Sequence, residues 1–331
     1  MRITMLMKSR AWLMTAMGAL ALMSLAACGG GDDDPSIGFI EGNWTSHMIA
    51  TEIIEQVVRD QLSYLTHRVP LSITPGWAAL CNEEVDIGAE AWLPSRLPEI
   101  QPFLDRECVV LGDTIFPGSI GWFVPRFVIE GDPGRGIEPM APGLESVADL
   151  DDYWQVFENP ERPDQGEVVG GEVGWIDHPQ DISRIMGYDL NYYRSNQGEA
   201  VILARVKSAE LQGQPILTYL WTPHSIFGEV DLVQLEEPHP YVERECFVEE
   251  EVPYQCAHPA FDVVTAMSTR LADIAPDVSN LVHHIFIGEQ PMSEMMFDVD
   301  SQERPIPEVA AEWIQANQTQ IDEWIADSNR G

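Results

Sequence analysis

Tryptophan is the residue type whose placement in this sequence points most directly to chemistry. The chain has ten tryptophans, and three of them, Trp92, Trp175 and Trp221, stand where a strand ends or a loop begins. A methylated ammonium ion donates no hydrogen bond, so a protein holds it by surrounding its diffuse charge with electron-rich ring faces, each worth roughly 0.5–2 kcal/mol when desolvated. Any one indole alone would be read as core packing. Together the three predict a cage for a quaternary ammonium ion.

The elements that must present these side chains follow from the pattern of apolar residues. Residues 85–92 alternate like a strand, and the Leu-Pro pair that follows ends it, because proline donates no hydrogen bond to a neighbouring strand. Side chains two apart along a strand share a face, so Glu90 and Trp92 should point the same way. A second predicted strand, over residues 215–220, delivers Trp221.

The rest of the chain alternates between predicted strands and predicted helices. Strands are expected over residues 36–40, 120–125 and, with a glycine-broken turn, 168–175; helices are expected over residues 45–66, 146–157, 181–188, 197–212, 259–275, 306–317 and 319–326. Asn43 and Ser146 stand where the first two helices need a cap. This order predicts an α/β chain with mostly parallel sheets. The roughly 295 residues from residue 36 onward exceed one ordinary core, which predicts two lobes.

The first 28 residues have the pattern of an export signal. Three basic residues precede an apolar run that is short for a membrane span, and the run ends at Leu25-Ala26-Ala27-Cys28. These four residues have the form of a lipobox, in which Cys28 becomes a lipidated N-terminus; an ordinary signal or a retained anchor is the alternative. Residues 29–35 contain nothing apolar, so we expect a flexible tether there.

Acidic residues dominate the charge of the chain. The formal net charge is -36, and removing the signal takes away three basic residues and no acidic one, so 15 Lys and Arg remain against 54 Asp and Glu and the charge becomes -39. Such a surface repels nucleic acid and anionic lipid, which argues against both as partners. It suits a solvated surface at high salt better than a dedicated cation-binding face.

Four further cysteines predict disulfides, because an exported chain meets an oxidising compartment. They are Cys81, Cys108, Cys246 and Cys256. Three connectivities are possible, and the local pairs Cys81–Cys108 and Cys246–Cys256 are the simplest. A zinc site is the alternative, but the chain has no Cys-x-x-Cys spacing and no histidine at ligand spacing beside them. We therefore expect no metal and no cofactor.

Several different short motifs are spread along the chain from residue 37 to Trp324. They are residues 37–44, Asp86–Pro94, Gly174-Trp175, Pro215–His224, Asp231-Leu232, 310–317 and Trp324. Together they resemble the glycine betaine/choline family of ABC-transporter binding proteins, the OpuAC-like family. The resemblance extends over essentially the whole mature chain, and Trp221-Thr222-Pro223-His224 is its most specific part.

The resemblance implies a type II periplasmic-binding-protein fold with the ligand in a cleft between two lobes. Lobe 1 is expected to be discontinuous, over residues 36–118 and 230–331, and lobe 2 to occupy residues 119–229. In the family three tryptophans box the trimethylammonium group. They fall on the three tryptophans named above, the first in lobe 1 and the other two in lobe 2.

A zwitterionic ligand also has a carboxylate to satisfy. The resemblance implies that backbone N–H groups after the first strand and a polar side chain near Trp-Thr-Pro-His meet it, which makes Gly42, Asn43 and His224 the candidates. A helix that begins after Asn43 supplies a physical reason, since its free N–H groups and dipole favour an anion. If Glu90 reaches the pocket, choline or another net cation becomes competitive; if it faces solvent, betaine is the better ligand.

The predicted function is high-affinity binding of a quaternary-ammonium compatible solute, glycine betaine or a close analogue, and its delivery to an ABC permease and ATPase. The protein is expected on the periplasmic or cell-surface side, held by its lipid anchor. Alternatives are a binding protein for choline, carnitine or another cationic amine, and a lipid-anchored receptor domain without a transport role. An enzyme is disfavoured, because the sequence lacks the common hydrolase, phosphate-loop and metalloprotease motifs and because His283 and His284 are adjacent and should point apart.

Overall fold

One long strand, β4 (Val109–Pro125), passes through the middle of a mixed sheet. The computed structural model describes residues 36–175, 177–242 and 256–326. Up to residue 118, β4 pairs antiparallel with β10 (Phe261–Ser268), and from residue 119 it pairs antiparallel with β8 (Thr218–Thr222). This change of partner divides the sheet into two parts, which we name the β1 half and the β8 half.

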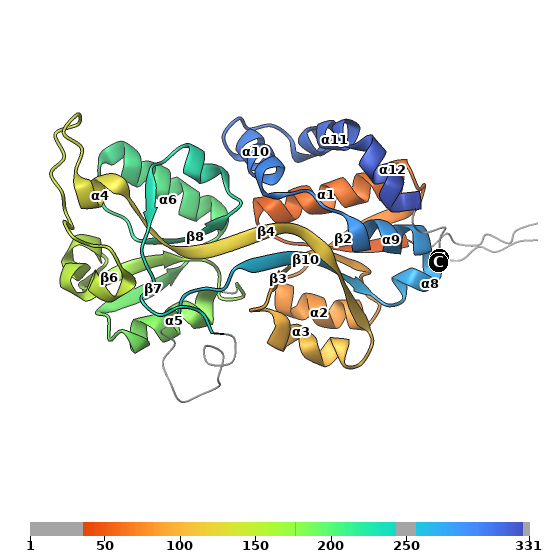
Figure 1. The fold of residues 1–331 in the computed structure, drawn as a ribbon, viewed down its shortest axis with the longest axis horizontal. Coiled ribbons are helices and arrows are strands. Elements are labelled where there is room, and N and C mark those ends of the chain that lie inside the picture. The colour runs from red at the N-terminus through yellow and green to blue at the C-terminus, as the bar shows by residue number, and fades with distance from the viewer. Residues whose placement is uncertain (1–35, 176, 243–255, 327–331) are drawn as a thin grey trace, which may run out of the picture. The chain divides into compact units, whose positions relative to one another are not determined.

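The β1 half combines an early and a late portion of the chain. Its strands are β1 (Ser36–Glu41), β2 (Leu65–Pro70), β3 (Ile87–Leu93), β10 and residues 109–118 of β4. Its helices are α1 (Thr45–Asp60), α2 (Ile73–Cys81), α3 (Leu97–Leu104), α8 (Leu271–Ile274), α9 (Pro276–His284), α10 (Glu289–Asp300), α11 (Ile306–Ala316) and α12 (Gln318–Ala326). Figure 1 shows α10 and α11 lying over α1. Gln56 Nε2 of α1 donates to the carbonyl of Pro307 in α11 at 2.9 Å.

The β8 half comes from the middle of the chain. Its strands are residues 119–125 of β4, β5 (Glu158–Asn159), β6 (Arg162–Gly170), β7 (Tyr192–Asn196), β8 and β9 (Leu232–Gln234). Its helical segments are α4 (Arg126–Glu130), the 3₁₀ helices η1 (Val147–Phe157) and η2 (Ser225–Gly228), α5 (Asp177–Gly187) and α6 (Glu199–Gln212). The strand order through both halves is β2-β1-β3-β10-β4-β8-β6-β5, with β7 beside β6 and β9 beside β4.

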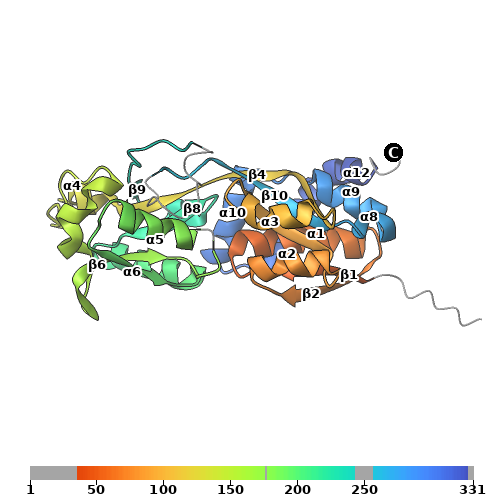
Figure 2. The same ribbon diagram turned by 90° about the horizontal axis from the view of Figure 1, so that it is seen from below.

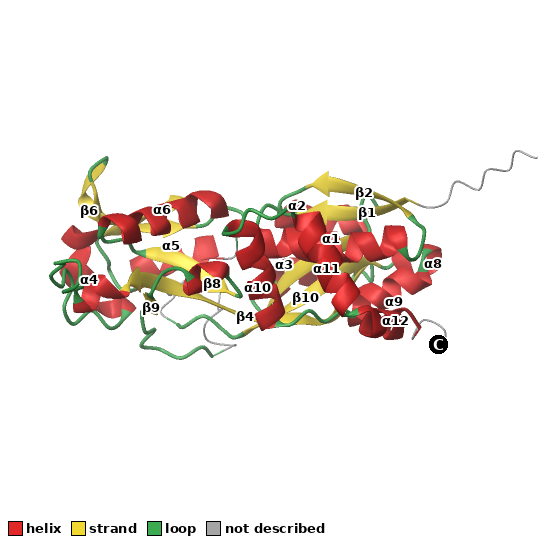
Figure 3. Cartoon of the chain, turned by 90° about the horizontal axis from the view of Figure 1, so that it is seen from above, coloured by secondary structure: helices red, strands yellow, loops and turns green. Residues whose placement is uncertain are grey.

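Helices cover both faces of the sheet. Figure 2, seen from below, brings α2, α3 and α5 to the front, whereas Figure 3, seen from above, brings α6, α10 and α11 to the front. Strands between two helical layers are buried on both sides, as the burial of nearly every residue of β3 and β10 indicates. Within the described residues, no helix is long and apolar enough to cross a bilayer.

The α/β class is confirmed, but the sheet is mixed rather than mostly parallel. The pairs β1–β2, β1–β3, β6–β7 and β6–β8 are parallel, whereas β4 and β10 run antiparallel to every strand they pair with. Alternating strands and helices predict parallel neighbours only where a helix returns the chain to the same edge. β4 and β10 instead carry the chain from one half to the other. The predicted lobe boundary at 118/119 lies at the change of partner in β4, and the division into lobes stays a prediction.

Two predicted helices are corrected by the structure. The range 259–275, expected to be one helix, contains the strand β10 and the short helix α8. β10 lies between β3 and β4 and its side chains are nearly all buried, and a fully buried segment has no periodicity to separate strand from helix. The helix expected over 45–66 ends at Asp60, and the chain continues into the edge strand β2. Trp44, not Asn43, occupies the cap position of α1 and makes no side-chain cap bond. The cap predicted at Ser146 is confirmed, although the segment is a 3₁₀ helix.

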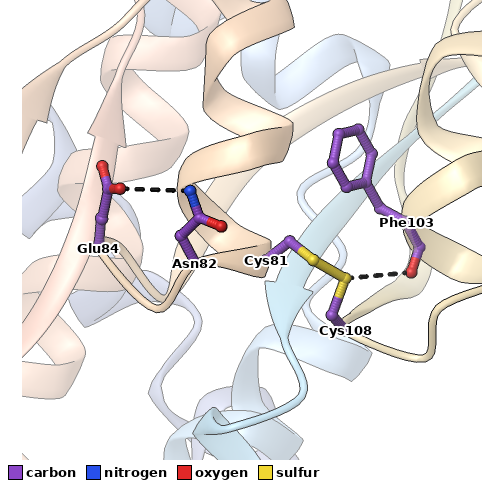
Figure 4. Close-up of a disulfide and its surroundings, with 5 residues drawn as sticks. All are labelled: Cys81, Asn82, Glu84, Phe103 and Cys108. Atoms are coloured by element: carbon purple, nitrogen blue, oxygen red, sulfur yellow. Dashed lines mark hydrogen bonds between the residues drawn. A yellow bond between two sulfur atoms is a disulfide. The ribbon is translucent and has the colours of Figure 1, made fainter.

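The predicted link between Cys81 and Cys108 is present, with their Cα atoms 4.9 Å apart. Figure 4 shows it joining the end of α2 to the segment that follows Phe103. Cys256 is also disulfide-bonded, and its predicted partner, Cys246, lies outside the described residues. The predicted signal, the lipidation site Cys28 and the tether lie outside them too.

Candidate functional site

Seven side chains from both halves line one cavity. They are Trp44, Glu90, Trp92 and Arg96 from the β1 half and Trp175, Tyr219 and Trp221 from the β8 half. The three predicted cage residues therefore lie together, and a fourth indole joins them. Glu90 also belongs to the lining, which answers the question the sequence left open.

Glu90 anchors two of the indoles. Its Oε2 atom accepts hydrogen bonds from Trp44 Nε1 at 2.8 Å and from Trp92 Nε1 at 3.0 Å. Glu90 and Trp92 lie two apart on β3, so the prediction that they share a face is confirmed. Trp44 comes from the start of α1, so one buried carboxyl group ties a strand and a helix into a single wall.

Burial changes the acidity of this carboxyl group. It raises the pKa of Glu90 to about 7, even though the hydrogen bonds from Trp44 and Trp92 favour the ionised form. A group with this pKa changes its charge around neutral pH. A cation in the cavity would favour the ionised form further, because opposite charges close together stabilise each other.

The rings of the facing wall contact one another. Trp175 and Trp221 meet edge to face with ring centroids 5.3 Å apart, and Tyr219 lies 5.7 Å from Trp221. Trp175 also meets Trp44 edge to face at 6.1 Å, which joins the two walls. The indole N–H of Trp221 is buried and has no hydrogen-bond partner.

Two glycines give the indoles room to approach the backbone. A Cβ atom on Gly118 would lie 2.6 Å from Cζ3 of Trp92, and one on Gly171 would lie 2.1 Å from Cε3 of Trp175. Both distances are far inside van der Waals contact, so any larger residue would displace a ring. β4 and the turn after β6 thus take part in placing the cage.

The three residues predicted to meet a ligand carboxylate lie outside the lining of the cavity. The Gly42 N–H donates to Nδ1 of His47 at 3.2 Å, and Asn43 Nδ2 donates to Glu172 Oε1 at 2.8 Å. Burial lowers the pKa of His47 to about 3, so its ring is neutral and can accept that bond. His224 is buried behind Trp221, with ring centroids 5.0 Å apart.

A carboxylate of the chain itself already occupies the start of α1. Glu199 Oε2 accepts from the Thr45 N–H at 2.6 Å and from Thr45 Oγ1 at 3.0 Å. Its other oxygen, Oε1, lies 3.1 Å from Nε2 of His224. The His224 Nδ1 atom accepts from the Ile226 N–H at 3.2 Å, so Nε2 carries the proton and donates to Glu199. Glu199 thus takes the helix N-terminus and the histidine that a ligand anion would need.

Arg96 brings a positive charge to the lining. Its Nη1 donates to both carboxylate oxygens of Glu99 at 2.9 and 3.0 Å, and its Nη2 donates to the carbonyl of Gly174 at 2.8 Å. The Arg96 side chain is 7% exposed, against 39% for Glu99. The bond to Gly174 ties the β1 half to the turn that carries Trp175.

Three lining residues were missed by the sequence prediction. Trp44 lies in a stretch that matches the family motifs, and its position in the short turn between β1 and α1 was the signal that could have found it. Tyr219 lies two before Trp221 on β8, the same spacing that linked Glu90 to its neighbour. Arg96 belongs to no motif, and only the fold brings it to the cavity.

Two groups of histidines and acids lie outside the lining. Glu199, His224 and Asp300 form a buried group, in which burial and the nearby Glu199 raise the pKa of Asp300. His284 Nδ1 lies 2.9 Å and His283 Nε2 lies 4.0 Å from Asp113, so the expectation that these adjacent histidines point apart is wrong. They are the last two residues of α9, where the chain leaves helical geometry.

Comparison with known proteins identifies a family of substrate-binding domains, which agrees with the presence of a cavity lined by aromatic side chains. The family model described as the substrate-binding domain of an ABC-type glycine betaine transport system matches residues 35–316. The glycine betaine/carnitine transport binding protein GbuC of Listeria monocytogenes serotype 1/2a (strain 10403S) is 23% identical over 171 residues, which are 49% of this chain and 52% of that protein. The chain therefore aligns with about half the length of this curated relative.

Solved structures share the fold at low sequence identity. An ABC-transporter choline-binding protein in complex with choline superimposes with a TM-score of 0.69 and 18% identity, over 88% of this chain and 92% of that one. Lactococcal OpuAC in its closed-liganded conformation with glycine betaine gives a TM-score of 0.68 and 17% identity, over 88% and 100% of the two chains.

Proposed function

Because the chain belongs to the family of substrate-binding domains of ABC-type glycine betaine transport systems and has the type II periplasmic-binding-protein fold, we propose that it binds a quaternary-ammonium compatible solute such as glycine betaine. The binding is of high affinity and takes place in the cavity lined by four tryptophans. The protein then delivers the solute to the permease and ATPase of an ABC importer.

The pair of indoles held by Glu90 is the observation that carries this proposal. A trimethylammonium group needs ring faces and a nearby negative charge, since it can neither donate nor accept a hydrogen bond. Trp44 and Trp92 are held in place by one carboxylate oxygen, so the rings need not be ordered when the ligand arrives. Such preorganisation lowers the entropic cost of binding.

Closure of two lobes would complete the cage. Hydrogen bonds link the halves around the cavity, among them those from Asn43 to Glu172, from Arg96 to the carbonyl of Gly174, and from Thr45 to Glu199. We infer that these bonds form on closure and that a ligand enters when they are broken, as in hinge-bending binding proteins.

Choline, carnitine or another cationic amine is the second candidate class. Within it Glu90 favours choline, because an ionised carboxylate beside the ring faces adds attraction for a net cation, whereas carnitine is a zwitterion. A lipid-anchored receptor domain without a small ligand is the third reading, and it predicts no response to any quaternary amine.

A ligand screen separates these candidates. Tryptophan fluorescence and thermal unfolding would be measured with glycine betaine, choline, carnitine, proline betaine and dimethylsulfoniopropionate. A ligand at 100 times its Kd stabilises the folded state by about 2.7 kcal/mol, which a melting experiment resolves. The proposal fails if none of the five shifts either signal, and the Trp92→Ala variant provides the matched control in which the cage is incomplete.

We also propose that Cys28 is lipidated and holds the protein at the outer face of a membrane. The Leu-Ala-Ala-Cys run supports this, together with a family that works outside the membrane as part of an importer. Cys28→Ser should release the protein from the membrane fraction. Retention of that variant in the membrane fraction would contradict the lipid anchor. The role in import has its own test: solute uptake that is unchanged in cells lacking both this protein and any second binding protein would contradict it.

A further inference from the structure

The usual reasons to expect a ligand carboxylate at the start of α1 are removed in this chain. The N–H of Thr45 and the Nε2 atom of His224 both bind Glu199, and the Gly42 N–H binds His47. A second anion at this position would face the Glu199 carboxylate at close range. If the ligand has a carboxylate, it needs donors elsewhere.

Arg96, which lines the cavity, can supply such donors. It is the only positively charged residue among the seven that line the cavity, and it is almost completely buried. A guanidinium group carries five N–H donors. The hydrogen bonds to Glu99 and Gly174 engage Nη1 and Nη2 and leave the Nε–H unbound. Nε and Nη2 form the side of the guanidinium group that binds two carboxylate oxygens at once.

Trp221 supplies another donor. Its buried N–H has no partner, whereas the N–H groups of Trp44 and Trp92 are both satisfied by Glu90. A buried polar group without a partner is costly, and in a binding site its partner can come with the ligand. A trimethylammonium group has no acceptor atom, so the acceptor must be an oxygen on another part of the ligand.

These donors flank the same side chain. Arg96 binds the carbonyl of Gly174, directly before Trp175, and the Trp221 ring lies 5.3 Å from the Trp175 ring. The acid in the cavity, Glu90, binds the other two indoles. The cavity therefore has a carboxyl group beside one pair of rings and free donors beside the other pair, which is complementary to a dipolar ligand.

We propose that the ligand is a zwitterion and that Arg96, assisted by the N–H of Trp221, binds its carboxylate in place of the anion site at the start of α1. This inference rests on the proposed function, since it assumes that a quaternary ammonium occupies the cage. It makes Arg96 a specificity-determining residue that favours carboxylate-bearing betaines over choline.

The test compares glycine betaine with choline, which share the trimethylammonium group and differ in the carboxylate. Titration calorimetry with both ligands should show that the parent prefers glycine betaine. Arg96→Gln should weaken glycine betaine binding about tenfold or more, because a charge-assisted bidentate contact is lost, and should leave choline binding unchanged or improve it. Trp221→Phe, which keeps a ring but removes the N–H, should shift the preference in the same direction by a smaller factor.

Three further results would overturn the inference. If Arg96→Gln weakens the binding of both ligands equally, Arg96 acts by positioning the turn that carries Trp175 and does not bind the carboxylate. If the parent prefers choline, the inference that the native ligand carries a carboxylate is wrong. If His224→Ala loses the preference for glycine betaine over choline and Arg96→Gln keeps it, the carboxylate binds at the start of α1. Glu99→Gln is the matched control, since it alters the partner of Arg96 outside the lining and should preserve the preference. If the parent binds neither ligand nor any other quaternary amine, the proposed function itself has failed.

Discussion

The two walls of the cavity are built on different principles. On the Glu90 wall, formed by Trp44, Trp92 and Glu90, each indole N–H is bound to the same carboxylate oxygen. On the Trp175 wall, formed by Trp175, Tyr219 and Trp221, the rings contact one another, and the Trp221 N–H has no hydrogen-bond partner. A polar anchor fixes the rotation of an indole before a ligand arrives. The comparison shows that hydrogen bonds fix the indoles of the Glu90 wall, whereas the Trp175 wall keeps a donor that the proposed ligand could bind.

Removing a ring from the Glu90 wall should have the largest effect. Trp92→Ala deletes a cage face worth about 2 kcal/mol when desolvated and leaves Glu90 with one donor instead of two. Affinity for the native ligand should fall about 30-fold or more, measured by calorimetry. Trp92→Phe should recover part of the loss, because a ring face returns without the hydrogen bond.

Trp313→Ala is the control for a general loss of stability. Trp313 is buried in α11, outside the cavity lining, so its removal should cost about 3–5 kcal/mol of unfolding free energy. Affinity should be unchanged at temperatures where this variant is folded. If Trp92→Ala binds as well as the parent, the Glu90 wall is not part of the site.

The dependence of ligand affinity on pH should give the next largest effect, because only the Glu90 wall contains a carboxyl group. Because the pKa of Glu90 is raised to about 7, its ionised fraction rises from about one tenth at pH 6 to about nine tenths at pH 8. Affinity for a quaternary amine should rise up to about tenfold over this interval. Glu90→Gln should bind with little dependence on pH. If the affinity of the parent does not change between pH 6 and 8, the charge of Glu90 does not contribute to ligand binding.

The same group should affect stability with the opposite sign. In the unfolded chain Glu90 has its ordinary pKa near 4.5, so between pH 4.5 and about 7 the folded state holds more protons. The unfolding free energy of the ligand-free protein should therefore fall as pH rises through this window. Chemical denaturation of the parent and of Glu90→Gln at pH 5 and 7 measures the contribution, and an equal slope for both proteins would contradict it.

The Trp175 wall should be more tolerant. Trp175→Ala should weaken binding about fivefold, at the lower end of the cation–π range, because it breaks no hydrogen bond of an indole N–H to Glu90. Trp175→Phe should bind nearly as well as the parent. If Trp175→Ala costs more than Trp92→Ala, the two walls have the opposite ranking.

The smallest effect is expected outside both walls. Asn43→Ala removes an exposed hydrogen bond to Glu172 across the halves, and such a bond contributes about 0.5 kcal/mol at the low end of its range. Affinity should fall about twofold. A tenfold loss would return Asn43 to the list of direct ligand contacts.

Local rules predicted the residues whose roles depend on spacing along one strand. Trp92 and Glu90 share a face because they lie two apart, and the Trp-Thr-Pro-His motif drew attention to Trp221. Arg96 obeys no such rule, since its place in the cavity depends on a turn contributed by the other half. Glu199 likewise met the start of α1 from a distant helix, so an N-terminus that looked free in the sequence was filled by tertiary contact.

The fold was predictable to a similar extent. Strands with a clear end, such as β1 before Gly42 and β3 at Leu93-Pro94, were found although they are buried, and the terminal helices α11 and α12 were found from their apolar stripes. β10 was missed because burial on both sides removes the alternation that marks a strand. Most antiparallel pairs of the sheet involve this strand or β4, so missing β10 and the first part of β4 led to the prediction of mostly parallel sheets.

Gly118 gives the molecule a mechanical linkage between its backbone and its ligand. It is the last residue of β4 to pair with β10, and Ser119 is the first to pair with β8. The Trp92 ring rests against it, with no room for a Cβ atom. A rotation of one half about this point would slide the strand beneath a wall of the cage. Occupancy of the cage and the angle between the halves would then change together, and under the proposed function a membrane partner would respond to that angle.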